Sequence, residues 1–205
     1  MKTQVLSTNE PEAFSRAERI LKRSQLVAFP TDTVYGLGAL AFDSQAIERL
    51  YAVKGRDSSK AIAVLIGDIS FLTQVTSEIR ETANRLAEHF WPGALTLVIP
   101  RSSTLPAILS PSNNIGVRIP DHPFALELLK RVGPLAVSSA NLSGKPSTIT
   151  AQEVFEQLNG LIPLIIDGGR TPGGTPSTVV DCTGPELSIL RQGSLTKSQL
   201  LSTIA

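Results

Sequence analysis

Short apolar segments alternate with amphipathic segments of helical period along most of this chain. The segments 25–29 (QLVAF), 61–66 (AIAVLI) and 94–99 (ALTLVI) are apolar over most or all of their length, as buried strands are. Segments such as 43–53 and 77–90 lie between them and repeat apolar residues every three or four positions. Strands buried on both faces need helices to cover them. The alternation therefore predicts an α/β fold.

The same pattern extends toward both ends of the sequence. Residues 14–21 predict a helix before the first strand, with Asn9 and Glu12 as its capping box. Thr150 and Glu153 predict a second capping box, for a helix over 151–158. Only loops separate the last three expected strands, so the end of the chain should be more antiparallel. The other expected elements are strands at 115–119, 134–138, 163–167, 177–181 and 187–191 and helices at 122–132 and 194–204.

Composition excludes several classes of protein. With 205 residues, 41% of them hydrophobic, and no linker-like tract, the chain is expected to form a single domain over 1–205. Nineteen Lys and Arg against eighteen Asp and Glu give a net charge of +1, so any site for a polyanion must be local. One cysteine, no secretory leader and no apolar run near 20 residues lead us to expect a cytoplasmic protein without a membrane partner.

Polar residues gather where the expected strands end. In open α/β sheets, ligands bind in the crevice beyond the strand ends. A lone Lys-Gly-Arg is commonly a solvated helix end, whereas an arginine inside a strand needs an anion or solvent as partner. A site rich in cations and hydroxyls is therefore expected. The gathered residues are Thr31, Thr33, the loop 54–60 (KGRDSSK), Arg118, the segment 138–145 (SSANLSGK), Ser177, Thr178 and Arg191.

Motifs of several common enzyme classes are missing from the sequence. Gly144-Lys145 is followed by Pro146, where a P-loop needs a hydroxyl, and no G-x-G-x-x-G follows the first strand. His89 and His122 occupy unrelated contexts and Cys182 reads as a core residue, which argues against a catalytic triad and against a protein metal site. What remains is a crevice that could position a polyphosphate, with Mg²⁺ brought by the nucleotide, beside a small polar molecule.

Seven motifs occur in order between about residues 25 and 193: FPTDTVYGLG, KGR, WPGALTLV, GVRIPDHP, SSANLSG, PSTVVD and ILRQG. Together they resemble the YrdC (TsaC) family of L-threonylcarbamoyladenylate synthases, in its short, single-domain form. The resemblance implies a twisted mixed sheet flanked by helices, with a large, positively charged concave cleft. It also implies that L-threonine, bicarbonate and ATP give threonylcarbamoyl-AMP and pyrophosphate, the first step toward N6-threonylcarbamoyladenosine in tRNAs that read ANN codons.

The resemblance further implies roles for individual residues and partners. Lys54 and Arg56 would be catalytic, Mg²⁺ would arrive with ATP without a dedicated protein site, and the product would pass to the tRNA threonylcarbamoyl-transfer machinery. L-threonine would bind at Thr31, Arg118, Ser138 and Ser177, and ATP at Lys54, Arg56, Ser58, Asn114, Ser139, Asn141, Thr148 and Arg191.

Two alternatives stay open. One is a double-stranded RNA or ribosome-associated binding module of the same fold, because the family's cleft is basic and some members have been described as binding RNA. The net charge of +1 and the 5% aromatic content argue against this as the main role, although RNA could still bind in the cleft. The other is a paralogue without the activity, against which the intact K-x-R (Lys54, Arg56) and S-x-N (Ser139, Asn141) motifs argue.

Overall fold

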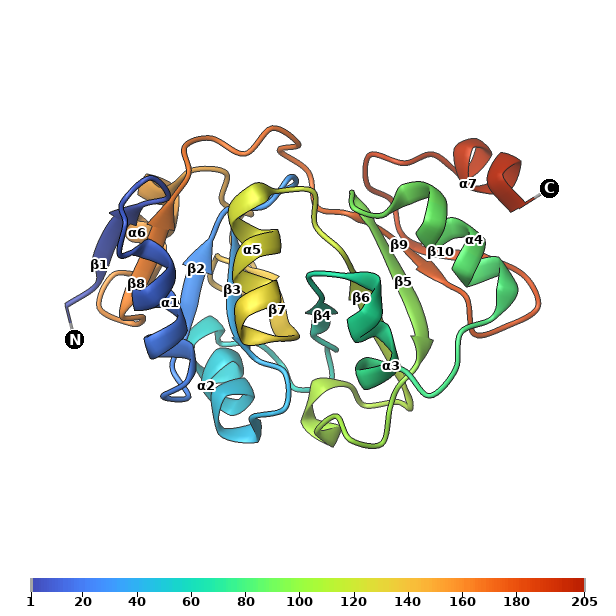
Figure 1. Ribbon diagram of the computed structural model, residues 1–205, viewed down its shortest axis with the longest axis horizontal. Coiled ribbons are helices and arrows are strands. Elements are labelled where there is room, and N and C mark those ends of the chain that lie inside the picture. Colours follow the sequence, from blue (N-terminus) through green and yellow to red (C-terminus); the bar gives the residue numbers. More distant parts are fainter. Residues whose placement is uncertain (1, 205) are drawn as a thin grey trace.

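The computed structural model describes residues 2–204, in which seven helices flank one twisted, mixed sheet of ten strands (Figure 1). The strands are β1 (Gln4–Ser7), β2 (Val27–Phe29), β3 (Gly36–Leu40), β4 (Ala63–Leu65), β5 (Leu95–Pro100), β6 (Asn114–Arg118), β7 (Leu135–Ser139), β8 (Leu164–Asp167), β9 (Thr178–Asp181) and β10 (Ser188–Arg191). The helices are α1 (Ala13–Leu21), α2 (Ser44–Lys54), α3 (Leu72–Val75), α4 (Glu81–Phe90), α5 (Pro123–Val132), α6 (Ala151–Leu158) and α7 (Lys197–Ile204).

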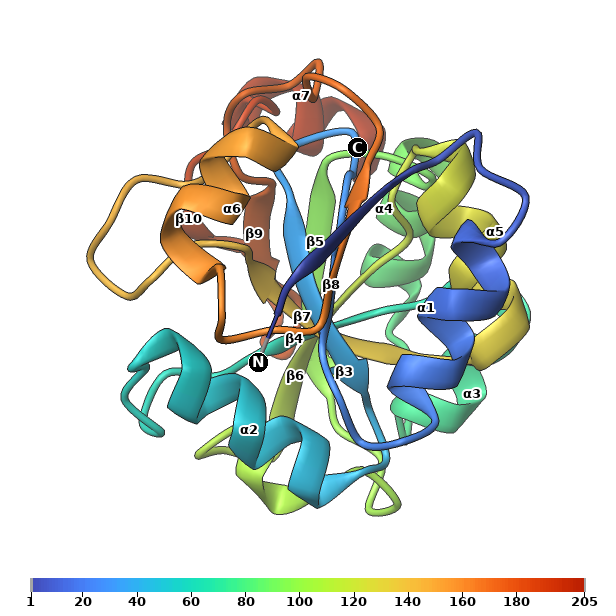
Figure 2. The same ribbon diagram turned by 90° about the vertical axis from the view of Figure 1, so that its left-hand side faces the viewer.

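The strand order is β1-β8-β2-β3-β7-β4-β6-β5-β9-β10. Figure 2 shows α1 and α5 on one side of the sheet and α2 and α6 on the other. The expected fold class, an α/β fold with a twisted mixed sheet flanked by helices, is therefore confirmed. Within the described residues, no helix combines the length and the apolar character needed to span a membrane.

The direction of the strands differs from the expectation. The pair β9–β10 is antiparallel as expected, but β8 runs parallel to both β1 and β2, and β9 runs parallel to β5. Antiparallel pairing also occurs early in the chain, between β2 and β3. The late strands do not pair mainly with each other. β8 and β9 pair with strands from the first half of the sequence, and only β10 pairs solely with another late strand. Loop lengths alone do not reveal this arrangement.

Two strands and one helix start were not anticipated correctly. The edge strand β1 has only four residues, and β3 is rich in glycine, so neither shows an apolar run. A Cβ on Gly36 would lie 2.7 Å from Cγ1 of Val137, which explains why glycine stands there. The capping box at Asn9 and Glu12 is wrong, because α1 follows Glu12 without a side-chain cap. Half of the box at α6 forms: the Thr150 hydroxyl accepts from the Glu153 N–H at 3.2 Å, but the Glu153 carboxylate accepts from the Ile149 N–H at 2.7 Å instead of from the Thr150 N–H.

The alternation of side chains along β5 separates the core from an open face of the sheet. Leu95, Leu97 and Ile99 are fully buried, whereas Thr96 and Val98 point to the opposite face. Elsewhere on that opposite face, α1 and α5 pack over β2, β7 and β8 in a second apolar cluster. The open part of the face, over β4, β5, β6 and β9, is where the candidate site lies.

Candidate functional site

A pocket of about 360 Å³ lies on this open face, and seven of the predicted site residues line it. Its floor consists of side chains from adjacent strands, and its rim comes from the loops that follow β2 and precede β9. The lining carries three arginines and, among the described residues, no acidic side chain. The pocket brings together Thr31, Arg56, Arg118, Ser138, Ser139, Ser177 and Arg191.

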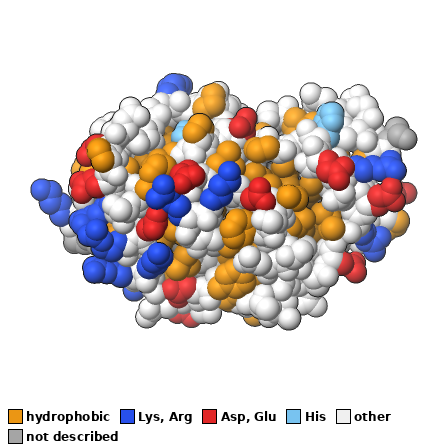
Figure 3. Space-filling view, viewed as in Figure 1, with side chains coloured by type: hydrophobic (Ala, Val, Ile, Leu, Met, Phe, Trp, Pro, Cys, Tyr) orange, Lys and Arg blue, Asp and Glu red, His pale blue; other side chains and the backbone are white. Residues whose placement is uncertain are grey.

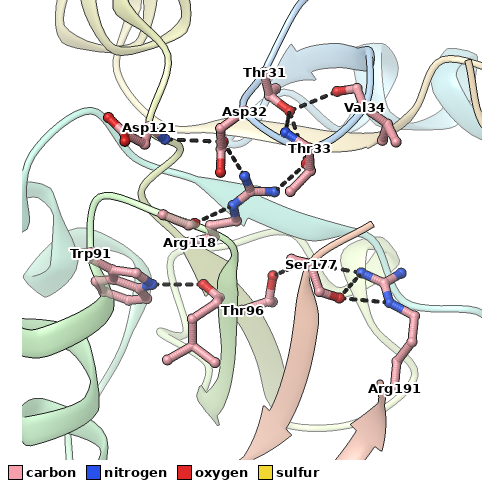
Figure 4. A network of polar contacts seen from close by, with 12 residues as sticks. Thr31, Asp32, Thr33, Val34, Trp91, Thr96, Arg118, Asp121, Ser177 and Arg191 are labelled. Carbon is pink, nitrogen blue, oxygen red and sulfur yellow. Dashed lines mark hydrogen bonds and ion pairs between the residues drawn. The ribbon is translucent and has the colours of Figure 1, made fainter. Parts of the chain in front are cut away.

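Arg118 at the end of β6 is almost completely buried and is held by three groups (Figure 4). Its Nε donates to the Gly93 carbonyl at 2.8 Å, and Nη1 donates to the Thr33 hydroxyl at 2.9 Å. Nη2 forms an ion pair with the carboxylate of Asp32. Burial lowers the pKa of Arg118, and the Asp32 charge opposes that effect. These contacts use three of the five guanidinium N–H groups and leave two for a ligand.

The turn after β2 is shaped by its own hydroxyl groups. Thr31 Oγ1 donates to the Val34 carbonyl at 2.7 Å and lies 3.0 Å from Thr33 Oγ1 (Figure 4). Asp32 accepts a hydrogen bond from the Asp121 N–H at 3.0 Å, which ties the turn to the start of α5. The hydroxyl and carboxyl groups in this stretch therefore fix the backbone and Arg118 at one end of the pocket.

Ser177 and Thr96 line the pocket next to Arg191. The hydroxyls of Ser177 and Thr96 are 2.7 Å apart, and Arg191 donates to the Ser177 carbonyl from Nε at 3.0 Å and from Nη2 at 2.9 Å. Burial and, to a smaller extent, the nearby charge of Arg56 lower the pKa of Arg191. Two guanidinium groups that repel each other without a carboxylate between them favour an anion at this end.

Arg56 reaches the pocket from the loop after α2. Its Nε donates to the Lys60 carbonyl at 3.2 Å and Nη2 to the Ala61 carbonyl at 2.9 Å. Neither Arg56 nor Arg191 makes a salt bridge within the described residues. The pocket lining thus contains three guanidinium groups, of which one is neutralised by Asp32.

Lys54 lies behind the pocket wall instead of in the lining. It is buried at the end of α2, where Nζ donates to the carbonyls of Ser139 and Asn141. Burial and, to a smaller extent, the charge of Arg56 lower its pKa to about 8. The ammonium group thus holds the loop after β7 in place, and in this structure it does not face the pocket.

Four other residues predicted to bind ATP also lie outside the lining. Asn141 donates from Nδ2 to the Leu142 and Lys145 carbonyls, at 2.9 and 2.8 Å, and its Oδ1 is buried without a hydrogen-bond partner. Thr148 is buried and donates to the Ala140 carbonyl at 3.1 Å. Ser58 is exposed in the loop after α2, and Asn114 begins β6, at the end of the strand opposite Arg118.

Sequence reasoning missed several residues of the pocket. Thr96 could have been found, because it is the polar member of an alternating strand whose other face is fully apolar. The pairing of Asp32 with Arg118 joins positions 86 residues apart and leaves no local signal. Tyr35 lines the pocket with its hydroxyl turned to the Gly169 carbonyl at 2.7 Å, and burial raises its pKa to about 12.

Side chains that could bind a metal ion or act as a nucleophile do not come together in a site within the described residues. Within residues 2–204 there is no group of three His, Cys, Asp or Glu side chains that could hold a metal ion. Cys182 belongs to the core, and burial raises its pKa to about 12, so it remains a thiol at neutral pH. The chemistry available to the pocket is hydrogen bonding and charge from guanidinium groups and hydroxyls.

Comparison with known proteins places this geometry in a family. The family model Sua5_yciO_yrdC, described as "Telomere recombination", matches residues 19–193. A Bacillus subtilis protein named "Threonylcarbamoyl-AMP synthase" is 43% identical over 98% of this chain and 59% of its own length. This chain thus spans about three fifths of that relative.

Two solved structures resemble the whole fold. Pyrococcus abyssi Sua5, solved in complex with L-threonine, has a TM-score of 0.95 and 39% identity, over 98% of this chain and 61% of that one. Escherichia coli YciO has a TM-score of 0.86 and 25% identity, over 97% of this chain and 99% of that one. From these matches and the family model, the chain belongs to the Sua5/YciO/YrdC family.

Proposed function

We propose that this chain is an L-threonylcarbamoyladenylate synthase that converts L-threonine, bicarbonate and ATP into threonylcarbamoyl-AMP and pyrophosphate. The observation that carries the proposal is the meeting in one pocket of Arg118 and Thr31 at one end with Arg56 and Arg191 at the other. The relative from B. subtilis carries the name of this activity, and P. abyssi Sua5 was solved with L-threonine. Both support the assignment.

The two ends of the pocket suit the two substrates. At the Asp32 end, the two remaining N–H groups of Arg118 would bind the threonine carboxylate, with Thr31, Ser177 and the backbone near Ser138 around the rest of the amino acid. At the other end, Arg56, Arg191 and Ser139 would bind the phosphates, because the two guanidinium groups lack a carboxylate partner there. The α-phosphate would then lie between the ends.

The reaction needs no covalent intermediate with the protein. The amine of threonine would add to the carbon of bicarbonate with loss of water, or to that of CO₂ with loss of a proton, to give a carbamate. A carbamate oxygen would then attack the α-phosphorus, breaking its bond to the leaving pyrophosphate. Arg56 and Arg191 would neutralise charge on the departing phosphates. Lys54 would act as a positioning residue, since its ammonium group holds the Ser139 and Asn141 carbonyls. Direct contact with ATP stays a prediction for Lys54, Ser58, Asn114, Asn141 and Thr148.

Mg²⁺ would enter as part of MgATP. The pocket lining offers arginines and hydroxyls but no carboxylate within the described residues, and this donor set suits the phosphates better than the ion. The ligands of Mg²⁺ would therefore be phosphate oxygens and water, and what the ion supplies is neutralisation of phosphate charge.

We further propose that the protein acts in the cytoplasm and passes its product to the tRNA threonylcarbamoyl-transfer machinery. The alternative role is RNA binding in the cleft.

A pyrophosphate-release assay tests the activity. Release should require threonine, bicarbonate and ATP together, and omission of any one should abolish it. Arg56→Gln and Arg191→Gln should each raise the KM for ATP by about tenfold, the loss of roughly one charged hydrogen bond. The matched control is Arg85→Gln, whose guanidinium pairs with Glu81 on the exposed side of α4. Full-rate release without bicarbonate would mean that ordinary threonyl-AMP is made, and would reject the proposal.

A further inference from the structure

A second concave region, which we call the α1 groove, lies apart from the central pocket. Its volume is about 400 Å³, and it shares no lining residue with the pocket. It is formed by the outer surface of α1, the start of the edge strand β1 and the segments before β2 and β8. Figure 3 shows Lys and Arg side chains gathered at this end of the molecule. The groove is lined by Lys2, Gln4, Arg16, Arg19, Ile20, Arg23, Gln25 and Pro163.

The cations of the α1 groove converge by helical spacing. Arg16, Arg19 and Arg23 are three and four positions apart, which places them along one face of α1 and the turn that follows it. Lys2 joins them from the segment just before β1. The whole chain has a net charge of only +1, so the rest of the molecule is net negative when these four residues are set aside. The excess positive charge of the chain is therefore concentrated in the α1 groove.

No carboxylate neutralises these four cations within the described residues. The acidic residue on the same helix, Glu18, lies 3.7 Å from Lys22 Nζ and 3.5 Å from Arg131 Nη1. Arg131 belongs to α5, so Glu18 faces the neighbouring helix instead of the groove. The helix therefore has a neutralised side toward α5 and a cationic side toward the groove.

Arg16 adds an observation of a different kind. Its side chain lines the groove, and its Nε is buried without a hydrogen-bond partner. An N–H group that is out of reach of both water and a protein acceptor is costly to leave unpaired, more so on a charged guanidinium. A turn of the Arg16 side chain toward the groove it lines would bring this N–H within reach of an anionic oxygen, which would supply the missing acceptor.

We propose that the α1 groove binds phosphate groups. Three arginines present planar forks that match phosphate oxygens, and the amides of Gln4 and Gln25 add neutral donors. None of the lining residues is aromatic, so the groove offers nothing on which a base could stack. Its ligand is recognised through its phosphates, either those of an RNA backbone or those of a free polyphosphate.

Two probes separate these sources: inorganic triphosphate and a single RNA strand of about 20 nucleotides. Amide resonances of ¹⁵N-labelled protein report on each region separately, which matters because triphosphate also suits the central pocket. Saturable shifts are expected in residues 13–25. If four phosphates are bound, log Kd for the RNA should change with log salt with a slope of about 3 in magnitude. Shifts in this region with triphosphate alone indicate a free polyphosphate ligand, and shifts with RNA alone indicate a strand.

Two double variants that each remove two positive charges, one inside the groove and one outside it, test whether phosphate binds in the groove itself. Arg19→Gln/Arg23→Gln should weaken the probe that binds by about tenfold or more, whereas Lys22→Gln/Lys197→Gln should change its Kd by no more than about threefold. Pyrophosphate release should be the same in both variants and in the unaltered protein. Equal weakening in the two variants would show diffuse attraction only, and no shifts in residues 13–25 with either probe would also overturn the proposal. So would polyglutamate binding as tightly as the phosphate probes, which would point to an acidic protein partner.

Discussion

The carboxylate of Asp32 and the guanidinium of Arg118 form a nearly buried ion pair that joins the turn after β2 to the end of β6. The two side chains are only 12% and 6% exposed. Thr33 and Gly93 complete the surroundings of the guanidinium, so its plane is fixed by groups on three sides. In the proposed reaction, the pair sets the direction in which Arg118 presents its two remaining N–H groups.

Asp32→Asn should therefore weaken both stability and threonine binding. Removing one partner of a buried pair leaves a charge without compensation, and a loss of about 3 kcal/mol in the free energy of unfolding is expected. The KM for threonine should rise while the KM for ATP changes little. Urea unfolding and steady-state kinetics measure these effects. Asp121→Asn is the control, because only the backbone of Asp121 contacts Asp32; an equal effect there would contradict the role of the pair.

Lys54 should make stability depend on pH in the alkaline range. Its pKa falls from 10.5 in the unfolded chain to about 8 in the folded protein, so between these values the unfolded state binds more protons. The stabilising contribution is complete above pH 10.5 and is lost as the pH falls through about 8. The unfolding free energy of the unaltered protein, relative to Lys54→Met, should thus rise across this window, by up to roughly 3 kcal/mol.

Urea titrations of both proteins at a series of pH values measure this difference. The comparison cancels other groups that titrate at high pH, such as Tyr35 and Cys182, because both proteins contain them. A difference that stays constant from pH 8 to 10.5 would show that Lys54 keeps an ordinary pKa.

Gly36→Ala should destabilise the sheet where it forms the pocket floor. The added Cβ would lie 2.7 Å from Cγ1 of Val137, and β7 cannot move aside without disturbing its neighbours. A loss of about 1–3 kcal/mol is expected from this overpacking. Gly184→Ala is a matched control, since the nearest atom to its Cβ would be 3.8 Å away. Thermal or urea unfolding of the two variants should differ clearly, and equal stability would refute the steric argument.

Substrate choice tests the hydroxyl-lined end around Thr31 and Ser177. If these groups exchange their present partners, the Val34 carbonyl and the Thr96 hydroxyl, for the threonine hydroxyl, bound valine leaves the exchanged groups unpaired. Its kcat/KM should then be lower by about 10⁴ or more. Serine lacks only a methyl group and should lose about 10 to 200-fold. Pyrophosphate release with each amino acid provides the measurement. Valine turnover close to that of threonine would remove the assignment of this end.

The sequence predicted the elements of this fold better than their pairing. Apolar runs and helical periods located most strands and helices because these signals are local. β3 was missed because its glycines are required by contacts with Val137 and Phe29, which lie in other strands. The short β1 was missed because it gains its hydrogen bonds only from β8, near the far end of the chain.

In the candidate site, too, the sequence predicted which residues take part better than which distant residues they contact. Motifs identified seven residues that do meet in the pocket, including Arg118 and Arg191. They did not reveal that Lys54 turns to the carbonyls behind the wall, or that Asp32 neutralises Arg118. Both facts depend on which distant segment is adjacent after folding, and residue type alone does not carry that information. Whether the residues outside the lining contact ATP stays a prediction.

The position of β8 between β1 and β2 has a consequence for how the protein is made. As the chain emerges from the ribosome, β2 appears early, but the neighbour that satisfies its outer edge begins at Leu164. Until then the backbone groups along that edge have no partner in the final arrangement, and an unpaired strand edge invites association with other chains. Translation must therefore pass β8 before β2 gains this neighbour, and the nascent chain is most exposed to aggregation during that interval.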